Sequence, residues 1–481
     1  RQHFPIWCKN GQKHFSIWDI LVIFASDSIN LSNMSHKIFR RKIYQKLLEW
    51  KNDSDGSSAL LIEGARRVGK STIAEEFAKN EYDDYLLIDF SIASEDIIDL
   101  FNHISDINRF FLGLQTLTGK TMPKRKSIII FDEVQFCPKA RQAIKHLVKD
   151  GRYDYLETGS LISIKKNVKN ILIPSEEIQM NMYPMDFEEF LWAIGKEASF
   201  DFIKNCYENL QPLGESINRA VMRDFRLYML VGGMPQAVNA YLDSNDFAVV
   251  DRKKREIIGL YEADFRKIDS SGRATTIFDH IPAELSRKVM RYKVGSVIDG
   301  AKPSRLGELF ADMEDSKTVN FAFQANDPSI GLAAHANFDF FKLYMADTGL
   351  FITLAFMDRD YTENDIYRKL LSDKLPTDLG YVYENVVAQL LVSAGHSLFY
   401  HIFKTKSGDN DDLHTYEVDF LISKKDKICP IEVKSSGYKS HKSLDEFQKK
   451  YSSRISQRYL IYTKDLRKEH DIICLPVYMT G

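Results

Sequence analysis

The first part of the chain alternates short apolar runs with stretches in which apolar residues recur at helical spacing. The apolar runs have the length and composition of buried strands and lie at residues 59–62, 85–90, 127–131 and, more weakly, 155–158. Helical spacing is found between them at residues 71–79 and 139–149, and before them at residues 39–50. Buried strands that alternate with helices are typical of a parallel sheet covered by helices on both faces. This part is therefore predicted to be an α/β domain.

Beyond residue 186 the pattern becomes mainly helical, and beyond about residue 371 it returns to α/β. The helical part has periodic stretches, followed by one extended stretch, at residues 187–194, 200–210, 217–229, 304–313 and 318–323. In the last part a helix near residues 384–394 precedes strands that are expected at residues 398–403, 416–422 and 431–434. Residues 407–412 have the composition of a hairpin loop between the first two of these strands. A chain of 481 residues is long enough for three or four domains.

The N-terminal segment and the cysteines bear on the location of the protein. Residues 17–25 form an apolar run that carries Asp19 and is much shorter than the roughly 20 residues of a membrane helix. The sequence opens on Arg1, and Met34 stands directly before the first helical pattern, so we expect residues 1–33 to be an unstructured leader. The five cysteines are scattered without a C-x-x-C pair, which favours reduced thiols. These features predict a cytoplasmic protein with no membrane span.

Charge and composition exclude only broad classes of protein. Lys and Arg total 65 and Asp and Glu total 67, which gives a net charge of −2. Hydrophobic residues at 44% and charged residues at 27% are close to globular averages and exclude a globally disordered chain. Balanced charge also excludes a protein that coats nucleic acid through a generally basic surface, but it leaves a local basic face open.

The strongest chemical signal follows the first apolar run. Residues 64–71 read Gly-Ala-Arg-Arg-Val-Gly-Lys-Ser and fit the pattern G-x-x-x-x-G-K-[ST] between a predicted strand and a predicted helix. Glycines allow backbone N–H groups to turn toward phosphate oxygens, and a helix N-terminus adds a positive dipole end. Lys70 would then reach the β- and γ-phosphates, and Ser71 would coordinate Mg²⁺. With ATP and Mg²⁺ as cofactors, the contacts are expected from Gly64, Arg66, Arg67, Gly69, Lys70, Ser71 and Thr72.

A second apolar run ends in two acids. Asp132 and Glu133 follow residues 127–131, and a buried strand would deliver both carboxylates to its carboxyl end. Asp132 is expected to support the Mg²⁺ shell, and Glu133 is expected to polarise the attacking water. After the next run, Ser160 is expected to contact the γ-phosphate, although a turn after a strand needs no such role. Arg66 and the neighbouring Arg67 face either phosphate or solvent.

The last part of the chain holds a second group of charged residues. Alternation places Glu417 and Asp419 on one face of a strand, and Glu432 and Lys434 on one face of the next strand. Glu384 lies on the helix that precedes both strands. Charged residues that alternate along a strand are also typical of a solvent-exposed edge. A reactive site and a hydrated surface are therefore both compatible with this pattern.

These motifs together resemble a group of prokaryotic AAA-type ATPases that carry a C-terminal domain of unknown function. The resemblance covers roughly residues 38–479 and rests on the phosphate-binding motif and on further segments. These are residues 131–135 (FDEVQ), 158–160 (TGS), 183–190 (YPMDFEEF), 231–235 (VGGMP) and 342–350 (KLYMADTGL). The resemblance implies an α/β fold with an AAA-like P-loop NTPase core, a helical lid, a winged-helix segment and a restriction-endonuclease-like end. It implies domains at residues 34–190, 191–275, 276–365 and 366–481.

The C-terminal residues also resemble the arrangement found in PD-(D/E)XK nucleases. That resemblance implies that Asp419 and Glu432 hold a second divalent metal, that Lys434 orients water against a phosphodiester, and that Glu384 completes the catalytic set. Two functions stay open. In one, ATP hydrolysis drives or gates a nuclease. In the other, the nucleotide switches a DNA- or protein-binding module whose nuclease-like domain is inactive.

Local basic stretches bear on the partner. They lie at residues 286–293, 302–305 and 438–442, and in the last of these Tyr438 could stack on a base while the lysines meet phosphates. The winged-helix segment implied by the resemblance would place a helix in a DNA groove. A run of charges is more often a solvated face. DNA, a protein partner and an oligomer therefore all stay open.

Overall fold

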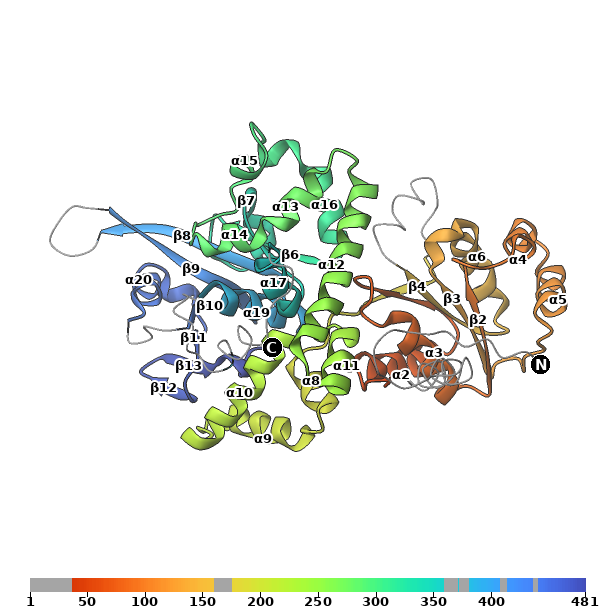
Figure 1. The fold of residues 1–481 in the computed structure, drawn as a ribbon, viewed down its shortest axis with the longest axis horizontal. Helices are drawn as coiled ribbons and strands as arrows, with labels where there is room; N and C mark the ends of the chain where they lie inside the picture. Colours follow the sequence, from red (N-terminus) through yellow and green to blue (C-terminus); the bar gives the residue numbers. More distant parts are fainter. Residues whose placement is uncertain (1–36, 160–174, 359–370, 372–379, 407–412, 436–439) are drawn as a thin grey trace, which may run out of the picture. The chain divides into compact units, whose positions relative to one another are not determined.

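Figure 1 shows the fold of the computed structural model. The residues that the structure describes are 37–159, 175–358, 371, 380–406, 413–435 and 440–481. The chain separates into two compact units, Arg1–Ile38 and Phe39–Gly481. The expected leader at residues 1–33 and the expected phosphate contact Ser160 lie outside the described residues. The elements named below all belong to the second unit.

Five parallel strands form the first sheet. In spatial order they are β2 (Asp84–Asp89), β3 (Ser127–Asp132), β4 (Asp154–Gly159), β1 (Ala59–Glu63) and β5 (Glu177–Asn181). Every residue of β1, β3 and β4 is buried, because these inner strands are covered on both faces. The prediction of a parallel α/β core is confirmed. The apolar pattern did not predict β5, which is polar, partly exposed and paired with β1 alone.

Apolar residues fill both faces of this sheet. Along β3, Ile128 and Ile130 belong to one core, and Ile129 and Phe131 belong to the other. The first core is covered by α2 (Ile43–Ser54) and α3 (Lys70–Glu81), and the second by α4 (Glu95–Leu100), α5 (Ile107–Thr118) and α6 (Pro138–Asp150). Because all the strands are parallel, their carboxyl ends meet at one edge, where ligands bind in open α/β sheets.

The middle of the chain is helical, as the periodicity predicts. Its helices are α8 (Phe187–Ala193), α9 (Glu197–Glu208), α10 (Glu215–Val231), α11 (Pro235–Ser244), α12 (Phe247–Ile268), α13 (Arg273–Asp279), α14 (Ile281–Ser286), α15 (Val294–Val297), α16 (Gly307–Asp315) and α17 (Thr348–Ala355). The 22 residues of α12 extend over about 33 Å. This helix packs against α11, α13 and α17 in one continuous apolar core. None of the described helices combines the length and the apolar character that crossing a membrane requires.

The second sheet has eight strands in the order β12-β13-β11-β10-β9-β8-β6-β7. In chain order they are β6 (Val319–Ala325), β7 (Ala336–Met345), β8 (Leu398–Lys406), β9 (Leu413–Lys424), β10 (Lys427–Lys434), β11 (Arg458–Tyr462), β12 (Arg467–Glu469) and β13 (Ile472–Pro476). Helix α19 (Gly380–Ser393) precedes β8, and α20 (Lys442–Tyr451) lies between β10 and β11. Because β6 pairs directly with β8, the sheet continues across the domain boundary expected at residues 365 and 366.

Strands β8 and β9 form the hairpin that the sequence predicts. Lys406 pairs with Leu413 across it, while the loop at residues 407–412 lies outside the described residues. Strand β9 is antiparallel to β10, and β10 is parallel to β11. The C-terminal part therefore has the element order α19-β8-β9-β10-α20-β11, which confirms a C-terminal α/β sheet.

Candidate functional site

The phosphate-binding motif forms a tight loop between β1 and α3. Gly69 has a φ of 102°, a left-handed conformation that favours glycine, directly before the helix. A Cβ atom at Gly64 would lie 2.3 Å from the carbonyl oxygen of Met182, so only glycine fits there. The Nζ atom of Lys70 donates hydrogen bonds to the carbonyl oxygens of Gly64 and Ala65, both at 3.0 Å. Lys70 thus reaches from the start of the helix back across the loop.

Lys70 is buried although it carries an ammonium group. Burial lowers the pKa of Lys70 to about 8, while the carboxylates of Glu133 and Asp132 oppose that shift and Arg66 adds to it. The guanidinium of Arg66 therefore lies within electrostatic reach of the ammonium. An anionic phosphate chain in the loop would compensate a charge that burial leaves poorly solvated. These residues fit the triphosphate of ATP.

The hydroxyl of Ser71 and the carboxylate of Asp132 lie side by side at the carboxyl edge of the sheet. Ser71 Oγ donates to Asp132 Oδ1 at 2.7 Å, and the hydroxyl of Thr158 donates to the same oxygen. The backbone N–H of Glu133 donates to Thr158 Oγ1 at 3.3 Å, and the Glu133 carboxylate accepts from the side chain of Gln135. Hydroxyl and carboxylate oxygens form the hard donor set that Mg²⁺ prefers, so the residues fit this ion.

Ser160, which the sequence analysis expects to contact the γ-phosphate, lies outside the described residues, and at the end of β4 Thr158 contacts Asp132. Thr158 was part of the motif, and its position within a buried strand marks it as a residue that needs a polar partner.

The other predicted contact residues are exposed, and one of them contacts helix α12. Arg66 Nη1 is 3.2 Å from Asp264 Oδ1 of α12, and the hydroxyl of Tyr261 on the same helix donates to the Arg66 carbonyl oxygen at 3.0 Å. Arg67 and Thr72 are exposed. Helix α12 therefore contacts the phosphate-binding loop at Arg66.

Arg41 is a buried arginine that the sequence analysis did not select, and it contacts the phosphate-binding loop. Arg41 donates to the carbonyl oxygens of Val68 at 3.0 Å and Tyr183 at 2.6 Å, and to Glu189 Oε2 at 3.0 Å. Tyr183 and Glu189 both belong to the segment at residues 183–190. Arg41 thus ties this segment to the loop, and only the pairing of a buried cation with a buried acid could have indicated it.

Three carboxylates from α19 and β9 converge in the C-terminal part. Oxygen atoms of Glu384, Glu417 and Asp419 lie within 4.8 Å of one another, the distance range of a metal site. Lys342 of β7 lies among them, with Nζ 2.7 Å from Glu384 Oε1 and a second ion pair to Glu417. The hydroxyl of Tyr344 also donates to Glu384. We name these five residues the carboxylate cluster.

The charged groups of the carboxylate cluster shift one another's pKa values. Burial raises the pKa of Asp419 well above its usual value, and the charge of Glu384 adds to this while Lys342 opposes it. Burial alone would lower the pKa of Lys342, but Glu384, Tyr344, Glu417 and Asp419 outweigh it, so the pKa of Lys342 is raised. An ammonium inside the cluster therefore supplies positive charge that a divalent metal would otherwise supply.

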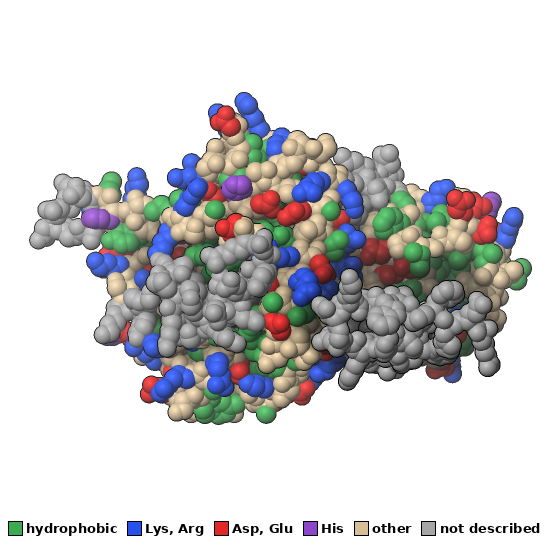
Figure 2. Space-filling model, in the orientation of Figure 1, with side chains coloured by type: hydrophobic (Ala, Val, Ile, Leu, Met, Phe, Trp, Pro, Cys, Tyr) green, Lys and Arg blue, Asp and Glu red, His purple; other side chains and the backbone are tan. Residues whose placement is uncertain are grey.

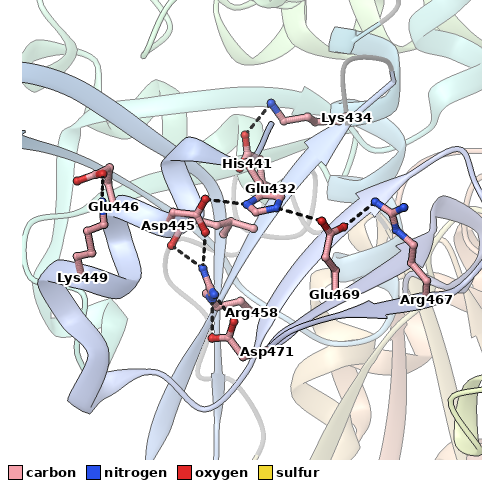
Figure 3. Close-up of polar contacts among 11 residues, drawn as sticks. Glu432, Lys434, His441, Asp445, Glu446, Lys449, Arg458, Arg467, Glu469 and Asp471 are labelled. Atoms are coloured by element: carbon pink, nitrogen blue, oxygen red, sulfur yellow. Dashed lines mark hydrogen bonds and ion pairs between the residues drawn. The ribbon is translucent and has the colours of Figure 1, made fainter. Parts of the chain in front are cut away.

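Glu432 and Lys434 lie on β10, next to the cluster. Lys434 Nζ is 3.0 Å from Glu432 Oε1, and the two form one end of the polar contacts in Figure 3. Burial raises the pKa of Glu432, while Lys434 lowers it, and Glu432 Oε2 has no hydrogen-bond partner among the described residues. Asp419 Oδ2 accepts from the backbone N–H of Val433 at 2.7 Å, which ties β9 to β10 at this point.

The structure thus brings Glu384 and Asp419 together and puts Glu432 and Lys434 on the adjacent strand. Sequence reasoning did not select Lys342, Tyr344 or Glu417 for this site. The signals were present, since Glu417 shares a face with Asp419, and the two other residues belong to the segment at residues 342–350.

Part of one predicted basic stretch is paired with an acid or packed on a ring. Arg287 pairs with Glu284, and Arg291 lies over the ring of Phe340, 4.2 Å from its centroid. Tyr438 and Lys439 lie outside the described residues. On the face in Figure 2, the basic and acidic side chains of the described residues alternate rather than gather into one basic surface.

Three family models match separate regions of the chain. Residues 56–191 match an AAA domain, residues 222–361 match a domain of unknown function (DUF8612), and residues 379–479 match a second one (DUF4143). The first match coincides with the parallel sheet, the phosphate-binding loop and the Ser71–Asp132 pair. This region is therefore similar to AAA domains, and it has the parallel sheet and the phosphate-binding loop of a P-loop NTPase fold.

Individual relatives are distant. An uncharacterised protein of Haemophilus influenzae is 27% identical over 190 residues, which is 38% of this chain and 44% of that protein, so the chain matches less than half of this curated relative. A Walker-type ATPase of Pyrococcus abyssi is similar with a TM-score of 0.40 and 17% identity over 66% of this chain and 97% of its own. The branch migration motor RuvB of Thermotoga maritima has a TM-score of 0.26 and 12% identity over 58% and 89% of the two chains. These scores are too low to assign a function.

Proposed function

We propose that the chain binds ATP with Mg²⁺ and hydrolyses it at the carboxyl edge of the first sheet. The observation that carries this proposal is the position of Ser71 Oγ, 2.7 Å from Asp132 Oδ1, beside the loop that Lys70 spans. A hydroxyl, a carboxylate and an ammonium group beside one loop support the binding of a metal-bound triphosphate.

Each residue then has one task. The loop N–H groups and Lys70 bind the β- and γ-phosphates, and Ser71 and Asp132 hold the metal ion. Bound Mg²⁺ would neutralise charge on the phosphates. Glu133 orients the attacking water and accepts its proton, and Thr158 fixes the carboxylate of Asp132 by donating to it. Gln135 contacts the Glu133 carboxylate and would have to release it when the water enters.

Two substitutions test this proposal. Lys70→Ala is expected to abolish nucleotide binding, and Glu133→Gln is expected to leave binding intact while lowering the ATP turnover rate by about 100-fold or more. Binding is measured by calorimetry with ATP and Mg²⁺, and turnover by phosphate release. Lys79→Ala, an exposed lysine on the same helix, is the matched control. Wild-type turnover in both Lys70→Ala and Glu133→Gln would refute the assignment.

We propose as a second function that the C-terminal sheet acts on DNA with a divalent metal under control of the nucleotide. The element order α19-β8-β9-β10-α20-β11 and the convergence of Glu384 with Asp419 support it. Asp419 and Glu432 would bind the metal, and Lys434 would orient the water that attacks a phosphodiester. The alternative is an inactive sheet that only binds DNA or a protein when the nucleotide state allows it.

A metal titration separates these two. Plasmid DNA is incubated with Mg²⁺ or Mn²⁺, with and without ATP, and wild type is compared with Lys434→Ala and with Lys468→Ala, an exposed lysine on β12. Cleavage that Lys434→Ala abolishes and Lys468→Ala retains is the expected result for a nuclease. Salt-sensitive DNA binding without cleavage would instead support the switched binding module.

A further inference from the structure

Two side chains of helix α12 contact Arg66 of the phosphate-binding loop. Tyr261 and Asp264 are three positions apart and therefore lie on one face of this helix. The hydroxyl of Tyr261 donates to the carbonyl oxygen of Arg66 at 3.0 Å. The carboxylate of Asp264 accepts from the guanidinium of Arg66, with Nη1 3.2 Å from Oδ1 and 3.4 Å from Oδ2. One residue of the loop is thus held by its backbone and by its side chain.

The hydrogen bond from Tyr261 and the ion pair with Asp264 differ in how readily water or a ligand can replace them. Tyr261 is buried, with 3% of its surface exposed, so its hydrogen bond fixes the loop backbone. The side chains of Arg66 and Asp264 remain 42% and 27% exposed, and an ion pair so open to water is held weakly. Asp264 also has Lys267 Nζ at 3.1 Å from Oδ1, so its charge stays compensated when Arg66 leaves.

Arg66 belongs to the phosphate-binding loop itself. It directly follows Ala65, whose carbonyl oxygen accepts from Lys70 Nζ at 3.0 Å, and its charge acts on that ammonium. A planar guanidinium forms charge-assisted hydrogen bonds to carboxylate and to phosphate oxygens alike. A terminal phosphate carries more negative charge than a carboxylate and would lie beside the buried Lys70, where water screens the attraction less, so it is a stronger partner for Arg66 than the hydrated carboxylate of Asp264.

We propose that Arg66 exchanges Asp264 for the terminal phosphate of a bound nucleoside triphosphate, so that Asp264 restrains Arg66 until a third phosphate is present. This inference rests on the proposed nucleotide site. Asp264 is then a positioning residue that sets the preference for the triphosphate over the diphosphate, and Arg66 is the residue that contacts the ligand.

The N-terminal half of α12 is held by buried hydrogen bonds that do not involve the loop. Asp251 accepts from Thr353 of α17 at 2.9 Å, and Lys254 donates to the carbonyl oxygens of Leu230 and Gly349 at 2.7 and 3.1 Å. These groups are buried and stay in place when Arg66 moves. Loss of the Arg66–Asp264 pair therefore removes one side-chain contact near the C-terminal end of α12, while Tyr261 still holds the loop backbone and the other end remains fixed to α10 and α17.

Affinities for ATP and ADP on the full chain test the exchange. Calorimetry in the presence of Mg²⁺ gives the dissociation constants for wild type, Asp264→Asn, Asp264→Glu and Glu262→Gln. Glu262 is the control, because it lies on the same helix and pairs with Arg266 instead. Asp264→Asn is expected to raise the affinity for ATP about fivefold and the affinity for ADP by less than twofold, which is a small allosteric coupling. Asp264→Glu and Glu262→Gln are expected to keep the wild-type ratio.

The double variant makes the inference specific to Arg66. Arg66→Ala is expected to remove the preference for ATP over ADP, and adding Asp264→Asn to Arg66→Ala is expected to change nothing further. A fivefold effect of Asp264→Asn that persists without Arg66, or an unchanged ATP-to-ADP ratio in Asp264→Asn, would overturn the exchange. If Asp264→Asn does not fold, Arg66→Lys replaces it and should lower the ratio, because a lysine lacks the planar fork. Absence of nucleotide binding in wild type would instead refute the proposed ATP site.

Discussion

Lys342 and Lys254 are both buried lysines, yet their pKa values shift in opposite directions. The ammonium of Lys254 contacts the carbonyl oxygens of Leu230 and Gly349, and burial lowers its pKa to about 8. Burial acts on Lys342 in the same direction, but the carboxylates around it outweigh the effect and raise its pKa. The carbonyl dipoles around Lys254 offset the desolvation of its charge only in part, whereas the acidic groups around Lys342 outweigh the effect of burial on its pKa.

Removal of Lys342 should be costly for the fold. Lys342→Met leaves Glu384, Glu417 and Asp419 buried without their cation, so we expect the free energy of unfolding to fall by about 3–5 kcal/mol. Urea denaturation at pH 7.5 measures this, with the exposed Lys468→Met as a control that should change it by less than about 0.5 kcal/mol. Adding Glu384→Gln to Lys342→Met should restore part of the loss. Equal stability of the two lysine variants would show that Lys342 does not neutralise the cluster.

The lowered pKa of Lys254 is expected to make the free energy of unfolding rise with pH. Its pKa is about 8 in the folded chain against 10.5 as the usual value, so the unfolded chain binds more protons between these two values. The free energy of unfolding therefore gains a contribution that rises with pH across this window, by up to about 3 kcal/mol. We expect the stability difference between wild type and Lys254→Met to grow in favour of wild type as the pH increases from 8 to 10.5. Urea denaturation at four pH values checks this, and a constant difference would contradict it.

The residues of the phosphate-binding loop could be predicted because they are close in sequence and their spacing reflects one tight turn of backbone. Gly64, Lys70 and Ser71 lie in a single loop and helix start. Lys342 could not be predicted in the same way, since it lies 42 residues from Glu384 and 75 from Glu417. Only the sheet brings these residues together, and no local pattern encodes that contact.

At the scale of elements, a strand could be predicted from the sequence when both of its faces are buried. Strand β3 is apolar at nearly every position because helices cover both of its faces, and the sequence shows this directly. Strand β5 is polar and pairs with β1 alone, so its sequence resembles a loop. Helix α12 was also missed, since its apolar stripe is interrupted by buried Asp251 and Lys254, which are satisfied only by other helices.

Two glycines lie on packed helices, and replacing each by alanine should change the free energy of unfolding in opposite directions. Gly259 lies inside α12 with open space where a Cβ would be, so Gly259→Ala should raise the free energy of unfolding by about 0.5–1 kcal/mol. A Cβ at Gly349 would lie 2.5 Å from the Cα of Gly232, so Gly349→Ala should lower it by about 3 kcal/mol or more. Thermal and urea denaturation of both variants measure the two signs. A stable Gly349→Ala protein would mean that α10 and α17 can separate at this contact.

At the scale of the whole molecule, buried polar contacts and one sheet connect the regions that the sequence divides. The hydroxyl of Tyr228 donates to the carbonyl oxygen of Met185 at 2.9 Å and accepts from the side chain of Gln389 at 2.8 Å. Gln389 in turn accepts from the N–H of Thr348 at 2.8 Å. The family resemblance implies a division at residue 365, but hydrogen bonds between β6 and β8 cross it. Unsatisfied buried groups on either side would make separate folding costly.

Fragments test whether residues 366–481 fold alone. This fragment lacks β6, β7 and Lys342, so it exposes the edge of β8, where Leu398 and Phe399 pair with Ala322 and Phe323, and it leaves the carboxylates without their ammonium. We expect residues 366–481 to show no cooperative thermal transition by circular dichroism, whereas residues 317–481, which keep all eight strands, should show one. The longer fragment is the matched control, because both contain the same described residues of α19 and α20. Cooperative unfolding of the shorter fragment would place the domain boundary at residue 365 after all and would make β6 and β7 an addition to an independent sheet.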